Sequence, residues 1–322
     1  MSALVSSAAQ SAAAFLQGKD HFLFLTHARP DGDTVGSAYA LTMAMREAGK
    51  SAWMLDNPSA GELYAPYFTA CCPEALPEEL TVVSVDVADT ALLPPEALPL
   101  AKKIVCVIDH HTVNHISCGT KCVEPTAAAT AEIVREIIAA MGLPLSSFTA
   151  EGIYMGMMTD TGCFKYSNVR PQTLTYAADA VAAGANAAAL ARRHFIKKSA
   201  ARMKLEATLI SGFTYFADGR ITVALLSRAE IEALGASEDD IGGMASLTVV
   251  PEKCEIGIFC RETEDGSVKA SVRTDLHADA ALLCAKFGGG GHVRAAGCTL
   301  KGFTLAEAAD ALRKEAEKLL VC

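Results

Sequence analysis

Short apolar runs alternate with longer segments of helical periodicity over roughly the first 195 residues. The runs are HFLFLTH, SAWMLD, TVVSVD and KIVCVID, and segments such as AYALTMAMREAG and TAEIVREIIAAMG separate them. Strands that alternate with helices are typical of a parallel sheet with helices on both faces. The pattern predicts an α/β domain with a doubly wound, mostly parallel sheet over residues 1–195.

A different pattern follows a charged, helix-favouring stretch at 196–212, which we interpret as a helical linker. Beyond it, FTYFADGRITVALLS and EKCEIGIFCRETEDGSVKASVRTD are typical of β-hairpins, and the DG pairs at 218–219 and 265–266 are strong turn signals. The segment TLAEAADALRKEAEKLL closes the chain as a helix. Residues 213–322 are therefore predicted to form a smaller α+β domain.

Composition fits two folded domains. The chain has 322 residues, of which 51% are hydrophobic and 20% charged, which is enough for two domains that each bury a core. Its formal net charge of -9 argues against broad binding to long nucleic acid or to an anionic membrane. We therefore expect neither long duplex nucleic acid nor a membrane as partner, and a polyanionic substrate would need local charge or metal.

Eleven cysteines lie along the chain without a CxxC pair. This usage predicts reduced thiols, with a zinc site at Cys118 and Cys122 as the alternative. The N-terminal segment has no basic region before an apolar core, and no stretch reaches the roughly 20 apolar residues of a membrane span. The sequence predicts a cytoplasmic protein.

Side chains of the metal-ligand type follow four apolar segments. They are His27, Asp31 and Asp33 in a loop after the first predicted strand, Asp86 after TVVSV, Asp109, His110 and His111 in VIDHH, and Asp160 after MGMMT. Each aspartate alone has the alternative of a helix cap or turn residue. The carboxyl ends of strands in an open α/β sheet converge, however, and clustered carboxylates repel one another unless cations neutralise them. The set predicts a site for two divalent ions, and its mixed imidazole and carboxylate ligands favour Mn²⁺ over Mg²⁺ or Ca²⁺.

A second candidate site lies near the C-terminus. Four glycines, Gly288, Gly289, Gly290 and Gly291, precede His292 and Arg294. We interpret them as a loop that side chains do not obstruct, so that backbone N–H groups can approach an anion. Arg273, at the end of a predicted strand, offers a guanidinium for bidentate phosphate binding. A flexible hairpin and a solvated strand end are the alternatives that these residues leave open.

The ordered set THARPDGDTVGS, SVDVAD, VIDHH and TDTGCF, followed by FGGGGHVRAAG, resembles the DHH phosphoesterases with their DHH-associated C-terminal domain. The resemblance covers nearly the whole chain. The two-domain length is most similar to the branch of nanoRNases and phosphatases of 3′-phosphoadenosine-5′-phosphate (pAp). Residues 1–195 would then be the catalytic domain, and residues 213–322 would bind substrate.

The resemblance also implies residue roles. His27 and Asp31 would hold one Mn²⁺, Asp33, His110 and Asp160 the other, and Asp86 would bridge both. Asp109 would orient a neighbouring imidazole, and His111 would contact a phosphate oxygen, so that Asp86, Asp109, His110 and His111 form the catalytic set. The implied substrate contacts are Arg273, Gly288, Gly289, Gly290, Gly291, His292 and Arg294.

The function this implies is hydrolysis of short oligoribonucleotides, such as nanoRNA and linear dinucleotides, and of pAp to mononucleotides through water activated by two metal ions. A cleft between two domains with one anion-binding loop offers few nucleotide positions, so we expect short single-stranded substrates. The alternatives are a cyclic-dinucleotide phosphodiesterase, an exopolyphosphatase or pyrophosphatase of the same superfamily, and a non-catalytic nucleotide-binding module. The sequence leaves a homodimer open.

Overall fold

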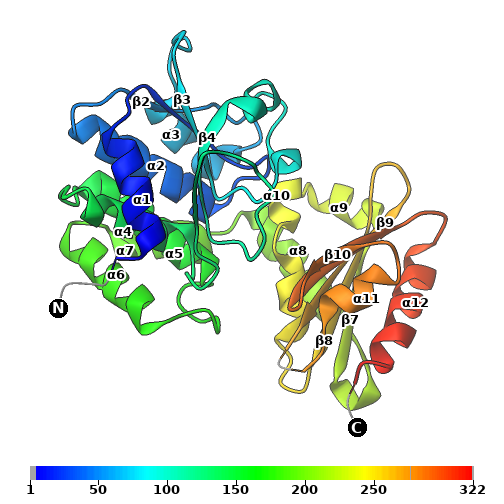
Figure 1. Ribbon diagram of the computed structural model, residues 1–322. Helices are drawn as coiled ribbons and strands as arrows, with labels where there is room; N and C mark the ends of the chain where they lie inside the picture. The colour runs from blue at the N-terminus through cyan, green and yellow to red at the C-terminus, as the bar shows by residue number, and fades with distance from the viewer. Residues whose placement is uncertain (1–4, 276, 321–322) are drawn as a thin grey trace. The chain divides into compact units, whose positions relative to one another are not determined.

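The computed structural model describes residues 5–275 and 277–320. The chain divides into two compact units, Met1–Lys197 and Lys198–Cys322, which are described separately below (Figure 1). No helix in the described ranges is both long and apolar enough to cross a membrane.

The first unit is built on a five-stranded sheet in the order β2-β1-β3-β4-β5. All of its neighbouring strands are parallel, which confirms the predicted sheet. The strands are β1 (Phe22–Leu25), β2 (Ala52–Met54), β3 (Thr81–Val85), β4 (Ile104–Asp109) and β5 (Thr120–Val123). The last of these is not among the predicted strands, because Cys122 is its only buried residue and its apolar signal is weak.

Seven α-helices accompany this sheet in the described chain: α1 (Ser7–Gln17), α2 (Gly32–Glu47), α3 (Gly61–Cys71), α4 (Thr130–Ala140), α5 (Ser147–Asp160), α6 (Pro171–Ala182) and α7 (Ala187–Ala191). Side chains alternate across the strands. Phe22 and Phe24 of β1 pack into a core with helices α1 to α5, whereas Leu23 and Leu25 face a second core. The short 3₁₀ segments η1 (Thr90–Leu92) and η2 (Leu98–Lys103) belong to the connection on that second side.

Helices α2 and α5 touch through their backbones, and this contact positions the candidate site. A Cβ atom on Gly36 would lie 2.3 Å from the carbonyl oxygen of Gly152, and one on Gly152 would lie 2.4 Å from that of Gly36. One turn further along α5, a Cβ atom on Gly156 would lie 2.6 Å from Oδ1 of Asp33. Glycine is therefore required for the close approach that brings Asp33 on α2 next to the end of α5.

The second unit contains a mixed six-stranded sheet in the order β10-β11-β9-β8-β7-β6. Its strands are β6 (Thr214–Phe216), β7 (Ile221–Leu226), β8 (Ile256–Glu262), β9 (Val268–Thr274), β10 (Gly290–His292) and β11 (Ala295–Leu300). Only β7 and β8 pair in parallel, and the predicted DG turns join β6 to β7 and β8 to β9. The predicted α+β class of this domain is confirmed.

Helices cover both faces of this second sheet. They are α8 (Ala200–Ser211), α9 (Arg228–Leu234), α10 (Glu238–Ile241), α11 (Ala280–Ala285) and α12 (Leu305–Glu317). Residues of α11 and α12 pack in one core, and residues of α8, α9 and α10 pack in the other. The stretch interpreted as a linker thus contains α8, whose Leu205 and Leu209 are buried in the second unit.

Candidate metal centre

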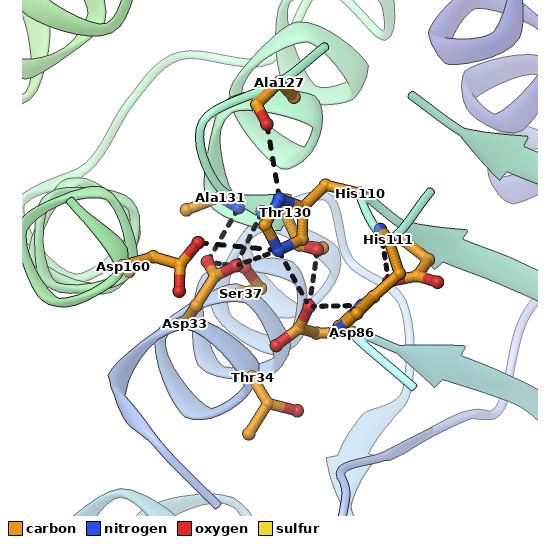
Figure 2. A network of polar contacts seen from close by, with 12 residues as sticks. Asp33, Thr34, Ser37, Asp86, His110, His111, Ala127, Thr130, Ala131 and Asp160 are labelled. Atoms are coloured by element: carbon orange, nitrogen blue, oxygen red, sulfur yellow. Dashed lines mark hydrogen bonds and ion pairs between the residues drawn. The ribbon is translucent and has the colours of Figure 1, made fainter. Parts of the chain in front are cut away.

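The predicted ligands of the first unit come together at the carboxyl edge of its sheet (Figure 2). Asp31 caps the N-terminus of α2, and Asp33 lies in the first turn of that helix, not in the preceding loop as its motif predicted. The other members lie as follows: His27 after β1, Asp86 after β3, Asp109 at the end of β4, His110 and His111 directly after it, and Asp160 at the end of α5. Strand order reverses between β1 and β3, which is where ligands bind in doubly wound sheets.

Three groups of side chains each bring their ligand atoms within 4.8 Å of one another. They are His27, Asp31 and Asp86; Asp33, His110 and Asp160; and Asp86, His110 and His111. Asp86 belongs to two of the three, and His110 links the second group to the third. The arrangement therefore has two ligand groups joined through Asp86 and His110.

Contacts of both ring nitrogens orient His110. Its Nδ1 lies 3.2 Å from the carbonyl oxygen of Ala127, so the proton of a neutral ring belongs on Nδ1. Nε2 points into a ring of carboxylates (Figure 2), at 3.5 Å from Asp160 Oδ2, 3.7 Å from Asp86 Oδ1 and 3.9 Å from Asp33 Oδ2. This tautomer leaves the Nε2 lone pair available for a cation held by those carboxylates.

Asp33 accepts hydrogen bonds from the N-terminus of α4. Its carboxylate accepts hydrogen bonds from the backbone N–H of Thr130 at 2.6 Å and of Ala131 at 3.0 Å, and from Ser37 Oγ at 3.2 Å. The N-cap residue of α4, Ala129, offers no side-chain oxygen. Asp33 supplies the missing acceptor, and the helix dipole favours its negative charge. The predicted ligand is thereby fixed by main-chain contacts from another element.

Asp86 combines burial with an unusual backbone. Its φ is +58°, a left-handed conformation that costs free energy in most residues other than glycine, and only 3% of it is exposed. Thr130 Oγ1 donates a hydrogen bond to Oδ1 at 2.9 Å. Oδ1 also faces His110, whereas Oδ2 lies 3.9 Å from His27 Nε2. The two oxygens of Asp86 thus face the two ligand groups separately.

Burial and mutual repulsion raise the pKa of three carboxylates in this cluster. Burial raises the pKa of Asp86 well above its usual value, and the charges of Asp33, Asp31, Asp160 and Asp109 raise it further. Burial followed by the charge of Asp33 raises the pKa of Asp160 to about 7, and burial also raises that of Asp33. Bound cations stabilise the ionised form of carboxyl groups whose pKa is raised by burial and like charge. The donor set therefore fits divalent metal.

Two further carboxylates are held ionised. Partial desolvation works to raise the pKa of Asp31, although its side chain is 56% exposed, but contacts with His27 and the N–H groups of Thr34 and Asp33 outweigh it and keep that pKa below its usual value. For Asp109, hydrogen bonds from His111 and Asn114 likewise outweigh burial and lower the pKa.

His111 is paired with Asp109. Its Nδ1 lies 2.7 Å from Asp109 Oδ1, and this hydrogen bond raises the pKa of the imidazole. Asn114 Nδ2 donates to the other oxygen of Asp109 at 2.7 Å and to the carbonyl of Val87 at 2.9 Å. The pair therefore positions His111 at the edge of the cluster, and Asn114 fixes the pair.

Three polar residues that support this centre were missed from the sequence: Thr130, Asn114 and Asn57. Asn57 is 3% exposed, and its Nδ2 donates to the carbonyl of His27 at 2.9 Å and to Thr26 Oγ1 at 3.2 Å. Its position directly after the second predicted strand was the available signal. Thr130 and Asn114 follow no strand, and only the folded arrangement shows their partners.

The candidate substrate contacts of the second unit lie on neighbouring strands. Arg273 of β9 pairs in register with Ala295 of β11, which pairs with His292 of β10. Arg294 connects β10 to β11, and its Nη1 donates to the carbonyl oxygens of Asp275 and Ala278. Part of this guanidinium thus holds the chain before α11.

The glycine segment differs from the unobstructed loop that was predicted, because Gly290 and Gly291 belong to strand β10. A Cβ atom on Gly289 would lie 2.2 Å from the carbonyl oxygen of Gly297. Gly291 has a φ of +146°, and a Cβ atom there would lie 2.6 Å from Cα of Ala296. A Cβ atom on Gly290 would meet nothing within 4 Å. Close packing against β11 thus requires glycine at two of the four positions.

The cysteines in the described ranges are all free thiols, ten in number. Cys118 Sγ donates to the carbonyl of Thr120 at 3.0 Å, and Cys122 is buried in the core of the first unit. None of the metal-ligand groups found among the described residues includes Cys118 or Cys122. The alternative of a zinc site there has no support in the structure.

Comparison with known proteins adds an independent observation. The model of the "DHH family, N-terminal domain" matches residues 21–157, and that of the "DHHA1 domain" matches residues 219–321. A Thermus thermophilus protein described as "Bifunctional oligoribonuclease and PAP phosphatase NrnA" is 33% identical over 88% of this chain and 85% of its own length. The Bacillus subtilis protein of the same description is 23% identical over 87% of this chain and 90% of its own length.

Among solved structures, an exopolyphosphatase-related protein from Bacteroides fragilis superposes with a TM-score of 0.88. The match covers 99% of this chain and 98% of that protein, at 22% sequence identity. At this identity the likeness concerns the fold alone.

Proposed function

This chain belongs to the DHH family of phosphoesterases, and from that membership we propose that it hydrolyses short single-stranded oligoribonucleotides and pAp to mononucleotides. The observation that carries the substrate class is the 33% identity to the Thermus thermophilus oligoribonuclease and PAP phosphatase, because it extends over both units. The candidate metal centre supports the chemical class. Its clustered carboxylates and imidazoles are suited to phosphoester hydrolysis.

Two divalent ions fit the ligand groups of the first unit. His27, Asp31 and Asp86 would hold one ion, and Asp33, His110 and Asp160 would hold the other. The opposite orientations of the two Asp86 oxygens support a bridging role for this residue. When bound, such ions supply positive charge to the phosphoryl oxygens and lower the pKa of a coordinated water. The mixed donor set favours Mn²⁺, with Mg²⁺ as the less suitable ion.

The chain's own residues would then orient the substrate and balance its charge. Asp109 holds Nδ1 of His111 at 2.7 Å, and we assign to this oriented imidazole a hydrogen bond to a phosphoryl oxygen. In the second unit, we assign phosphate binding to Arg273, to His292, to the glycine segment Gly288–Gly291 and to Arg294. A binding set with so few cations suits a short substrate.

A substrate panel tests this function. The metal-free protein is supplied with Mn²⁺ or Mg²⁺ and incubated with pApA, a ribonucleotide trimer, pAp, cyclic di-AMP or pyrophosphate. We expect mononucleotides from the first three substrates, at a higher rate with Mn²⁺. Exclusive turnover of cyclic di-AMP or of pyrophosphate would instead identify one of the two alternative enzymes, and binding of pAp without any turnover would identify a non-catalytic module.

A further inference from the structure

The chain that follows Asp160 adopts a backbone that few sequences tolerate. Gly162, Cys163 and Phe164 have φ values of +57°, +61° and +60°, so three consecutive residues lie in the left-handed region. Cys163 and Phe164 have no special tolerance for it, so their conformation costs free energy that the surrounding contacts must offset. Such strain directly after a candidate metal ligand points to a function for this turn.

Contacts at both ends close the turn into a loop. At its start, the carbonyl of Thr161 accepts hydrogen bonds from the N–H of Lys165 at 2.9 Å and of Tyr166 at 3.1 Å. At its end, Asn168 Nδ2 donates to the carbonyl of Asp160 at 3.2 Å and to that of Ala128 at 3.0 Å. The loop therefore begins and ends beside Asp160, whose carboxylate points into the metal centre (Figure 2).

Tyr166 is the aromatic side chain that this closed loop exposes to solvent. Its residue is 57% exposed, whereas the other five tyrosines of the first unit, all within the described ranges, are buried or half-buried. The ring lies against Gly162, because a Cβ atom there would fall 2.3 Å from the ring carbon Cζ. Glycine at this position and the left-handed backbone together hold an exposed aromatic face on the loop that starts at Asp160.

We propose that Tyr166 is a stacking platform for the base of the nucleotide whose phosphate reaches the metal centre. An aromatic ring stacks on any nucleobase, because every base has a π-face, so the contact gives affinity without strong sequence preference. This inference rests on the proposed function, since it assumes a nucleotide substrate. It adds a base contact to a set of residues that otherwise recognise phosphate and metal.

Binding of AMP and of ribose 5-phosphate tests the platform directly, because the two ligands differ only by the base. Calorimetry is performed on the full chain with Mn²⁺. We expect the parent protein to bind AMP more tightly than ribose 5-phosphate, and Tyr166→Ala to weaken AMP binding by roughly five- to a hundredfold. Affinity for ribose 5-phosphate should stay unchanged in this variant. Tyr166→Phe, which keeps the ring, should bind AMP like the parent.

Tyr215→Ala is the matched control, because Tyr215 is likewise an exposed tyrosine, at 54%, and belongs to β6 of the second unit and not to this loop. It should leave both affinities unchanged. Equal weakening of AMP and ribose 5-phosphate in Tyr166→Ala would show that the residue only supports the loop, and parent-like AMP binding would show that it does nothing; either result overturns the proposal. Hydrolysis of pAp in the same variants separates the two claims, since a parent that binds AMP through Tyr166 but hydrolyses no substrate would contradict the proposed function alone.

Discussion

The metal centre of the first unit concentrates charge, whereas the candidate phosphate-binding residues of the second unit lie along paired strands. In the first unit, four carboxylates and three imidazoles form linked groups whose ligand atoms lie within 4.8 Å of one another, and burial with like charge works against the ionisation of Asp33, Asp86 and Asp160. In the second unit, Arg273 and His292 are separated by the whole width of β11. The comparison indicates that the first set depends on bound cations to offset the repulsion between its carboxylates, whereas strand pairing keeps Arg273 and His292 of the second set apart.

Substitution of Asp86 is expected to give the largest effect. Asp86→Asn keeps a residue type that tolerates the left-handed backbone but removes the charge that faces both ligand groups. We expect hydrolysis of pAp to fall by about a thousandfold or more. In metal-free buffer, the free energy of unfolding of the variant should be at least that of the parent, because the substitution removes a buried carboxylate that its neighbours repel. Substantial remaining activity would be incompatible with a bridging role.

The second unit should respond more weakly and without a change in metal content. Arg273→Ala removes a charged donor to phosphate, and the loss of one such hydrogen bond costs about 1.5–3 kcal/mol. We expect kcat/KM for pAp to fall by roughly ten- to a hundredfold, while elemental analysis finds as much bound manganese as in the parent. Arg261→Ala is the control, because Arg261 lies on β8 of the same sheet and forms an ion pair with Glu238 of α10. Parent-like turnover by Arg273→Ala would remove this residue from the substrate contacts.

Metal should stabilise the first unit only. A ligand at a hundred times its Kd adds about 2.7 kcal/mol to the free energy of unfolding, which corresponds to a rise in Tm of about 5–10 °C for a unit of this size. Calorimetric scans with and without Mn²⁺ should show this shift in one transition and none in the other. Asp86→Asn should show a smaller shift, and a metal-dependent transition of the second unit would contradict the assignment.

The glycines of β10 should differ from one another, and this is the smallest expected effect. Gly291→Ala places a methyl group against Ala296 at a φ that disfavours side chains, so we expect a loss of about 1–3 kcal/mol from the free energy of unfolding of the second unit. The methyl group of Gly290→Ala would point into open space, so this variant should change the free energy of unfolding by less than about 0.5 kcal/mol. Urea denaturation measures both, and equal losses would show that packing against β11 does not distinguish them.

Much of the fold was predictable because strands and ligands share one signal. Four of the five strands in the first sheet are continuous apolar runs, and most candidate ligands follow three of these runs, whereas Asp160 ends helix α5. Strand β5 was missed because a single residue in it is buried. The three left-handed residues after Thr161 were not predictable, since Cys163 and Phe164 rarely adopt positive φ. Thr130 and Asn114 were missed because their roles depend on which groups meet after folding.

Manganese titration followed by calorimetry tests the central claim most directly. We propose that the first unit of this chain holds two divalent ions through ligand groups that share Asp86. Metal-free parent protein should therefore bind two Mn²⁺ per chain, and Asp86→Asn should lose at least one of them while its circular dichroism spectrum stays that of the parent. Binding of a single ion by the parent, or two ions bound equally well by the parent and Asp86→Asn, would contradict it.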